Sequence, residues 1–138
     1  MVSHHAFSNL TCMRHVQQFN DSDCGIAVLA MLAGCPYGAV THAFPDATHH
    51  GLYVREMAAM LSTLTGRAWS EVRGQRHPAL TCARLPRRAC AAIIGQPSWR
   101  YGHWVALECG IVYDPNFDRP IELADYPRQH WRVLRVVR

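Results

Sequence analysis

The sequence predicts an α+β fold in which helices from the first half of the chain pack on an antiparallel sheet from the second half. Apolar residues recur at helical spacing before residue 66, and short apolar runs separated by turn residues dominate after it. The run from residue 26 to residue 33 has almost no polar side chains, so we expect a central buried helix with Cys24 at its start. Helices followed by strands are typical of α+β domains.

The composition is that of one globular domain spanning residues 1–138, with residues 1–15 as an irregular lead-in. Hydrophobic residues make up 49% of the chain and charged residues 17%, which excludes a disordered protein. No apolar run reaches the roughly 18 residues of a membrane span, so membrane insertion is not expected. The N-terminus lacks the basic start and apolar stretch of a secretory signal, so the expected location is cytoplasmic.

The formal net charge is +4, and all fourteen basic residues are arginines. These arginines are scattered along the chain, and only Arg84, Arg87 and Arg88 lie close together in the sequence. Basic arms and alternating basic and aromatic residues, which single-strand binders use, are absent. We therefore do not expect a nucleic-acid partner.

The cysteines and histidines do not have the spacing of a zinc site. Structural zinc needs closely paired ligands, and the adjacent pairs His4-His5 and His49-His50 do not supply them. Without a signal sequence, reduced core thiols are the expected state of the cysteines. No metal and no organic cofactor is expected. The six cysteines are Cys12, Cys24, Cys35, Cys82, Cys90 and Cys109.

The chain up to residue 44 predicts two helices and a short extended piece at residues 16–19. The first helix is expected over residues 23–33, with Asp23 as its N-cap and Gly34 as its C-cap. Pro36 blocks its continuation, and residues 39–44 form a short second helix.

A polar loop at residues 46–51 leads into an amphipathic helix over residues 52–65. Gly66 ends this helix. Its apolar stripe is assigned to core packing and consists of Tyr53, Met57, Met60, Leu61 and Leu64.

The second half predicts five short strands. A tight turn at Cys109-Gly110 joins two of them into a hairpin, and residues 125–130 form a polar connection before the last. Residues 73–88 carry two prolines and no clear element. The expected strands are residues 68–72, 89–94, 103–108, 111–113 and 131–137.

Cys24 is the candidate nucleophile. A cysteine in the first turn of a helix meets unpaired backbone N–H groups and the positive end of the helix dipole, which favour a reactive thiolate. A thiol hydrolase also needs an imidazole and a group that orients it. His103 opens one strand of the predicted hairpin and Asp114 follows the other, so both fall near the same hairpin end.

Gln18 is the candidate oxyanion donor. It lies six residues before Cys24, from where its side-chain amide and the backbone N–H of Cys24 can hold the oxyanion that develops during attack. Gln17 is a rival that only the spacing disfavours. The alternative reading of Cys24 is an inert buried thiol, and that of Asp114 is an ordinary turn residue before Pro115.

Three motifs in the order Cys, His, Asp resemble the bacteriocin-processing cysteine peptidases. These are papain-like domains that cut double-glycine leader peptides and are usually fused to ABC exporters. Gln-Phe-Asn-Asp-Ser-Asp-Cys-Gly at residues 18–25 resembles the start of such a domain. Gly-His-Trp-Val-Ala-Leu at residues 102–107 resembles the family's His motif, and Ile-Val-Tyr-Asp-Pro at residues 111–115 its Asp-Pro motif.

The resemblance implies a papain-like fold with Cys24 as nucleophile, His103 as base, Asp114 as the orienting acid and Gln18 as oxyanion donor. The chain carries neither membrane helices nor a phosphate-binding Gly-Lys-Ser/Thr loop, so we expect a free-standing relative acting on a peptide or protein substrate. Two alternatives stay open. The same residues can deamidate glutamine or transfer an acyl group, as in toxins and effectors, and a papain-like shell can bind peptides without catalysis.

Overall fold

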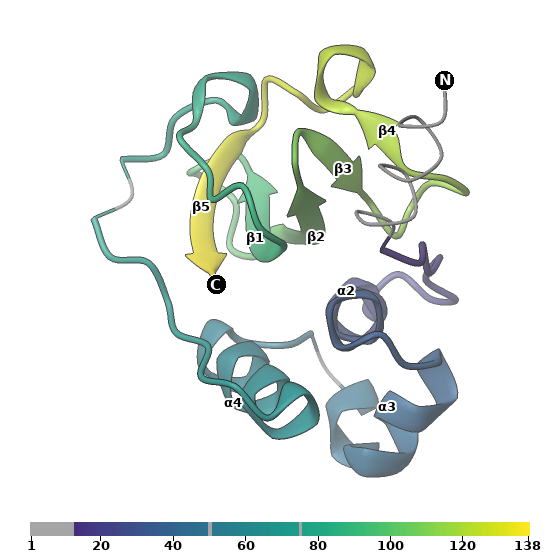
Figure 1. Cartoon of the computed structure of the whole chain (residues 1–138). Coiled ribbons are helices and arrows are strands. Elements are labelled where there is room, and N and C mark those ends of the chain that lie inside the picture. Colours follow the sequence, from purple (N-terminus) through teal and green to yellow (C-terminus); the bar gives the residue numbers. More distant parts are fainter. Residues whose placement is uncertain (1–12, 50, 75) are drawn as a thin grey trace, which may run out of the picture.

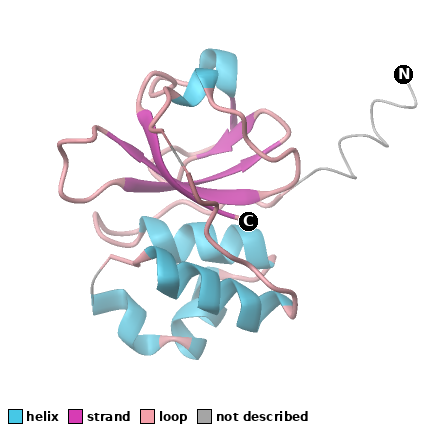
Figure 2. Ribbon diagram, turned by 90° about the vertical axis from the view of Figure 1, so that its left-hand side faces the viewer, coloured by secondary structure: helices cyan, strands magenta, loops and turns pink. Residues whose placement is uncertain are grey.

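The protein folds into two layers, one of helices and one of antiparallel strands, in a computed structural model (Figures 1 and 2). The structure describes residues 13–49, 51–74 and 76–138. The expected lead-in lies largely outside these residues, as do Cys12 and the pairs His4-His5 and His49-His50, apart from the backbone of His49. The prediction of helices in the first half packed on a sheet from the second half is confirmed.

The helical layer is built around α2 (Cys24–Ala33). Its first eight residues, from Cys24 to Met31, are buried, because the sheet covers one side of the helix and α3 and α4 cover the others. Gly34 ends the helix in the left-handed region with φ 68°, as expected of a C-cap glycine. The prediction of a central buried helix with Cys24 in its first turn is confirmed.

Helix boundaries differ from the predicted ones by a few residues. The second helix, α3 (Tyr37–Ala43), starts directly after Pro36, because the fixed φ of proline suits the position before a first turn. A 3₁₀ helix, η1 (Pro45–His49), replaces part of the expected loop. The third helix, α4 (Val54–Thr65), starts after Tyr53, whose backbone N–H is bound by the Glu56 carboxylate at 3.0 Å.

The second half forms one five-stranded sheet with the order β4-β3-β2-β1-β5, and all four neighbouring pairs are antiparallel. The predicted hairpin of β2 and β3 is present, and its turn residues Cys109 and Gly110 have φ angles of 50° and 78°. Positive φ at both turn residues matches the twist of the two strands. The strands are β1 (Cys90–Gly95), β2 (His103–Glu108), β3 (Ile111–Tyr113), β4 (Ile121–Glu122) and β5 (Arg132–Val137).

One prediction for the second half is wrong, and three elements appear that the sequence did not predict. Residues 68–72 do not form a strand. Backbone hydrogen bonds join Ser70 to Arg138 and Val72 to Val136, but they amount to one isolated bridge, between Glu71 and Val137. The two-residue strand β4 was not expected, since it pairs only with β3 and is too short for a period-2 pattern. Two 3₁₀ helices, η2 (Leu80–Cys82) and η3 (Leu123–Asp125), also lie in segments without a sequence signal.

Both faces of the sheet are buried. Ala91, Trp104 and Ala106 pack toward the helices, whereas Ala92 and Val105 pack on the opposite side. Strands buried on both faces read as continuous apolar runs, which explains why β1 and β2 lack clean alternation in the sequence. The opposite face is covered by apolar side chains from η2 and from the connection before β5. Leu80 and Tyr126 of these segments are fully buried, as is Val133 of β5.

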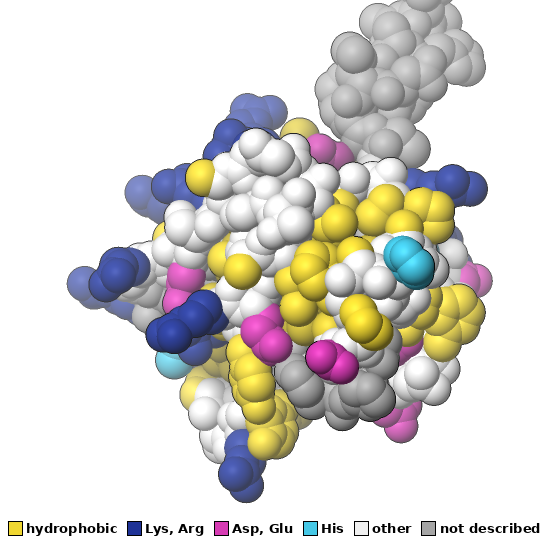
Figure 3. Space-filling view, turned by 90° about the horizontal axis from the view of Figure 1, so that it is seen from below, with side chains coloured by type: hydrophobic (Ala, Val, Ile, Leu, Met, Phe, Trp, Pro, Cys, Tyr) yellow, Lys and Arg dark blue, Asp and Glu magenta, His cyan; other side chains and the backbone are white. Residues whose placement is uncertain are grey.

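No single helix in the described part of the chain is long and apolar enough to cross a membrane. Helices α2 and α3 reach that length and apolar content only together, and they are bent by 105° relative to each other. On the outer face of the helical layer, hydrophobic side chains gather near the middle and arginine side chains stand around the margin (Figure 3).

Gly102, next to His103, allows a close approach between β1 and the start of β2. A Cβ atom at this position would lie 2.2 Å from Ile93 Cγ2 and 3.0 Å from the Ile94 carbonyl oxygen. We predict that Gly102→Ala lowers the free energy of unfolding by about 1–3 kcal/mol through overpacking, measured by denaturant unfolding. Gly38→Ala is the control, because a Cβ there meets no atom within 4 Å. Equal stability of the two variants would contradict the prediction.

Candidate active site

The loop before α2 is held by the carboxylate of Asp23. This group is 3% exposed and accepts the backbone N–H groups of Phe19 and Asn20, each at 3.0 Å, and the Tyr37 hydroxyl at 2.8 Å. Asp23 is the N-cap residue of α2, as predicted, but its side chain makes no capping hydrogen bond and binds the preceding loop instead. Burial, the hydrogen bond to Asp23 and the charge of Asp23 raise the pKa of Tyr37 to about 12.

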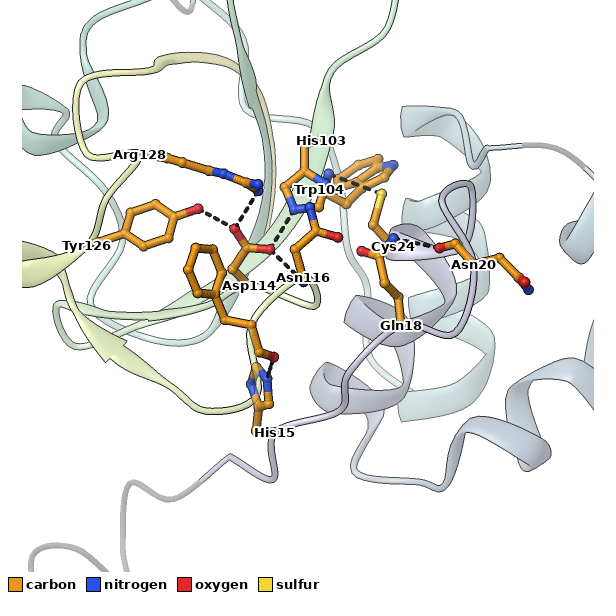
Figure 4. Close-up of polar contacts among 11 residues, drawn as sticks. His15, Gln18, Asn20, Cys24, His103, Trp104, Asp114, Asn116, Tyr126 and Arg128 are labelled. Carbon is orange, nitrogen blue, oxygen red and sulfur yellow. Dashed lines mark hydrogen bonds and ion pairs between the residues drawn. The ribbon is translucent and has the colours of Figure 1, made fainter.

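The Cys24 side chain lies between the first turn of α2 and the start of β2. The backbone N–H of Trp104 donates to Cys24 Sγ at 3.5 Å, and the side chain of Cys24 is largely buried. Trp104 also donates its indole N–H to the Leu52 carbonyl at 2.9 Å. Trp104 therefore joins the sulfur to the sheet (Figure 4), and its indole joins the sheet to the segment that leads into α4.

His103 and Asp114 are in direct contact. His103 Nε2 lies 2.6 Å from Asp114 Oδ1, which leaves Nδ1 of the ring for the side where Cys24 lies (Figure 4). The register of the β2–β3 hairpin explains the contact: Ala106 pairs with Tyr113, so the residues before Ala106 and after Tyr113 share one end of the hairpin. The structure thus brings together Cys24, His103 and Asp114, as the sequence predicted.

The Asp114 carboxylate has three further donors. The Asn116 backbone N–H binds Oδ1 at 2.9 Å, while Oδ2 accepts the Tyr126 hydroxyl at 2.5 Å and Arg128 Nη1 at 3.0 Å. At 1% exposure, an ionised carboxylate requires such partners. Sequence reasoning missed Tyr126 and Arg128, which lie in the connection assigned only as polar. No local sequence signal identifies them, because a buried carboxylate needs hydrogen-bond donors but the sequence does not show which distant segment supplies them.

These contacts decide the charges of His103 and Asp114. Burial, the largest effect, lowers the pKa of His103, but its hydrogen bonds to Asp114 and Cys24 and their charges raise that pKa to about 9. Burial raises the pKa of Asp114, whereas the His103 contact, the Tyr126 hydroxyl and the Asn116 amide lower it below its usual value. Imidazolium and carboxylate therefore face each other at neutral pH.

Gln18 lies on the loop before α2, on the side of the Asp-Pro turn. Its backbone N–H donates to the Pro115 carbonyl at 2.9 Å, which ties this loop to the segment after Asp114. Its side-chain Nε2 donates to the Asn20 carbonyl at 2.6 Å, and its Oε1 is buried with no hydrogen-bond partner in the described part of the chain. The rival, Gln17, is exposed.

A pocket of about 640 Å³ opens at Cys24. Its inner wall is apolar and includes Leu52, Val54 and Trp104, all largely buried. Neither His103 nor Gln18 lines it. The other lining residues come from the loop before α2, the segment that leads into α4, the β1–β2 loop and the strands: Asp21, Ser22, Gly51, Tyr53, Arg55, Ile93, Arg100, Tyr101, Gly102 and Arg135.

Within residues 13–49, 51–74 and 76–138, no three His, Cys, Asp or Glu side chains gather into a group that would hold a metal ion. Cys24, Cys35, Cys82, Cys90 and Cys109 are free thiols. Burial raises the pKa of the Cys90 thiol to about 12 and also raises that of Cys35.

The fold is that of a known peptidase domain. The chain superposes on the peptidase domain of Streptococcus ComA, a bi-functional ABC transporter involved in a quorum-sensing pathway, with a TM-score of 0.57. The match covers 91% of this chain and 96% of that domain at 15% sequence identity. No protein-family model and no curated protein sequence matches the chain. The fold expected from the sequence resemblance is therefore confirmed.

We predict that stability depends on pH through His103 and Asp114. The His103 contribution is fully present below pH 6.5 and is lost as the pH rises through about 9, a shift worth about 3 kcal/mol. The Asp114 contribution is present above pH 3.8 and is lost as the pH falls through its lowered pKa. Thermal unfolding across pH measures both effects. A His103→Gln variant with a curve parallel to that of the wild type between pH 6.5 and 9 would contradict the prediction.

Replacing Arg128 tests its influence on the pKa of His103 in the contact with Asp114. We predict that Arg128→Met raises the pKa of His103, because the charge of the Asp114 carboxylate is then less compensated, and NMR titration of the His103 ring measures this pKa. We also predict that Tyr126→Phe lowers the free energy of unfolding by about 1–3 kcal/mol, which denaturant unfolding measures. The control is Arg119→Met, since Arg119 pairs with Asp118 where both side chains are 75% exposed. Identical His103 titrations in the two arginine variants would rule out the influence of Arg128.

Proposed function

We propose that the protein is a cysteine peptidase that cleaves a bond in a peptide or protein substrate. The observation that carries the proposal is the 2.6 Å contact of His103 with Asp114, with the other ring nitrogen on the side of Cys24. The fold shared with a peptidase domain supports the same reaction class. The pocket at Cys24 gives an extended peptide access to the sulfur.

The proposed reaction starts with a Cys24 thiolate and a His103 imidazolium. The sulfur attacks the carbonyl carbon of the scissile bond, and the carbonyl electron pair moves to oxygen. The Cys24 backbone N–H and the Gln18 amide hold this oxyanion, the latter by exchanging its bond to the Asn20 carbonyl for one to the substrate.

His103 then gives its proton to the leaving amine as the C–N bond breaks, which leaves a thioester on Cys24. Water attacks the thioester, His103 takes the proton of that water, and the acid product leaves with the Cys24 thiolate restored. Asp114 keeps the imidazole in the orientation that turns Nδ1 toward the sulfur. Every step uses groups of this chain, the substrate and water.

The test compares thiol reactivity with exposure. We predict that Cys24 reacts with iodoacetamide near pH 6 faster than Cys82 and Cys109, although these two are exposed and Cys24 is 9% exposed. Mass spectrometry of tryptic fragments measures the labelling rates. Asp114→Asn should slow the labelling of Cys24 alone. Equal rates for the three thiols would refute the ion pair.

The same variants test catalysis on a peptide library digested from a proteome. We expect Cys24→Ala to abolish cleavage, Gln18→Ala to lower kcat by about 10²–10³-fold and Cys82→Ala to leave it unchanged. Mass spectrometry of the products separates peptide-bond cleavage from glutamine deamidation and acyl transfer, which start from the same thioester. Peptides bound without any product would favour the non-catalytic alternative.

A further inference from the structure

The pocket at Cys24 gathers three arginines from segments that are distant in the sequence. Arg55 lies in the first turn of α4, Arg100 in the β1–β2 loop and Arg135 in β5, and all three line the same pocket as the sulfur. Arginines are scattered along this chain, so their convergence beside the proposed nucleophile comes from the fold and not from a basic run.

Two of these three cations lack an acidic partner among the residues that the structure describes. Arg135 is neutralised by Glu71, with Nη2 at 2.8 Å from Oε1 and a second contact between Nε and Oε2. Arg55 and Arg100 make no ion pair with any carboxylate in the described parts of the chain, and both are exposed. Asp21 contributes one negative charge to the described lining, which leaves the pocket with a positive excess.

Local helix stability does not explain Arg55. A cation in the first turn of a helix faces the positive end of the helix dipole and costs about 0.3–1 kcal/mol. Arg100 lies on an exposed loop, with its guanidinium 5.7 Å from the ring centroid of Tyr101. Both guanidinium groups are therefore available to an anionic ligand in the pocket.

The reaction geometry decides which part of a substrate enters the pocket. In the proposed mechanism the leaving amine must lie beside His103, which protonates it. His103 does not line the pocket. The proposed mechanism therefore assigns this pocket, which Cys24 lines and His103 does not, to the acyl side of the sulfur, where the residues N-terminal to the scissile bond bind.

We propose that this pocket selects a substrate with an aspartate or glutamate among the residues N-terminal to the scissile bond, and that Arg55 and Arg100 bind its carboxylate. Tyr53 and Tyr101, at 60% and 69% exposure, flank the bound segment, and the apolar wall of Leu52, Val54 and Trp104 takes its neighbouring side chains. The assignment to the acyl side rests on the proposed peptidase function.

The first experiment measures binding without turnover. Cys24→Ala protein is titrated with fluorescent peptides that differ at one position only, as glutamate, glutamine or lysine, and the position is moved along the peptide. We expect one position at which glutamate binds about three- to tenfold tighter than glutamine, with lysine weakest. The preference should shrink in high salt, because exposed charges are screened.

Charge reversal identifies the residues responsible. Added to Cys24→Ala, Arg55→Glu or Arg100→Glu should remove the glutamate preference, and both together should favour lysine. The matched control is Arg84→Glu, an exposed arginine outside the pocket, which should bind like the parent. Equal discrimination by the Arg55, Arg100 and Arg84 variants would overturn the proposal.

A cleavage assay separates this inference from the proposed function. With Cys24 intact, the Arg55 and Arg100 variants should lose the preference for the acidic peptide over the neutral one, mainly through KM, whereas Arg84→Glu should keep the wild-type preference and cleavage rates. Cleavage without acidic preference would overturn the inference and leave the peptidase proposal standing. Glutamate-selective binding without cleavage would refute the peptidase proposal and retain the anionic subsite.

Discussion

The structure depends on the burial of α2, a helix with no polar face. Because none of its sides can face water, the sheet must cover one side and α3 and α4 the others, and this requirement explains the two-layer arrangement. The first turn of α2, which contains Cys24, is the part of the helix that contacts the loop at residues 18–23 and lines the pocket. The fold and the candidate site thus follow from one constraint. Gly25 fits it too, since a Cβ there would lie 3.0 Å from Leu52.

A second constraint is the buried charge of Asp114. Its four donors come from β2, the turn after β3 and the connection before β5, so one carboxylate links segments on both sides of the β2–β3 hairpin. A buried carboxylate with fewer donors would be unstable or neutral. The groups that stabilise this charge also set the charge and orientation of His103. Stability and the proposed chemistry are therefore coupled at this residue.

The segment before α4 connects these two parts. Its Leu52 carbonyl accepts the Trp104 indole N–H, Trp104 holds the Cys24 sulfur through its backbone, and the next residues form a wall of the pocket. The proposed anionic subsite is built on this same wall by Arg55 and completed by Arg100 across the pocket. The elements that position the sulfur would therefore also position the substrate.

The sequence by itself determined the fold class, the buried helix, the β2–β3 hairpin and the candidate Cys24, His103 and Asp114. These features rest on local signals: apolar periodicity, turn residues and motif spacing. Tertiary structure decided what depends on contacts between distant segments. It directed the side chain of the N-cap residue Asp23 to the preceding loop, reduced the expected strand at residues 68–72 to one bridge, and brought Tyr126 and Arg128 to Asp114. It also gathered scattered arginines at one pocket, because long side chains on separate segments meet only when the chain is folded.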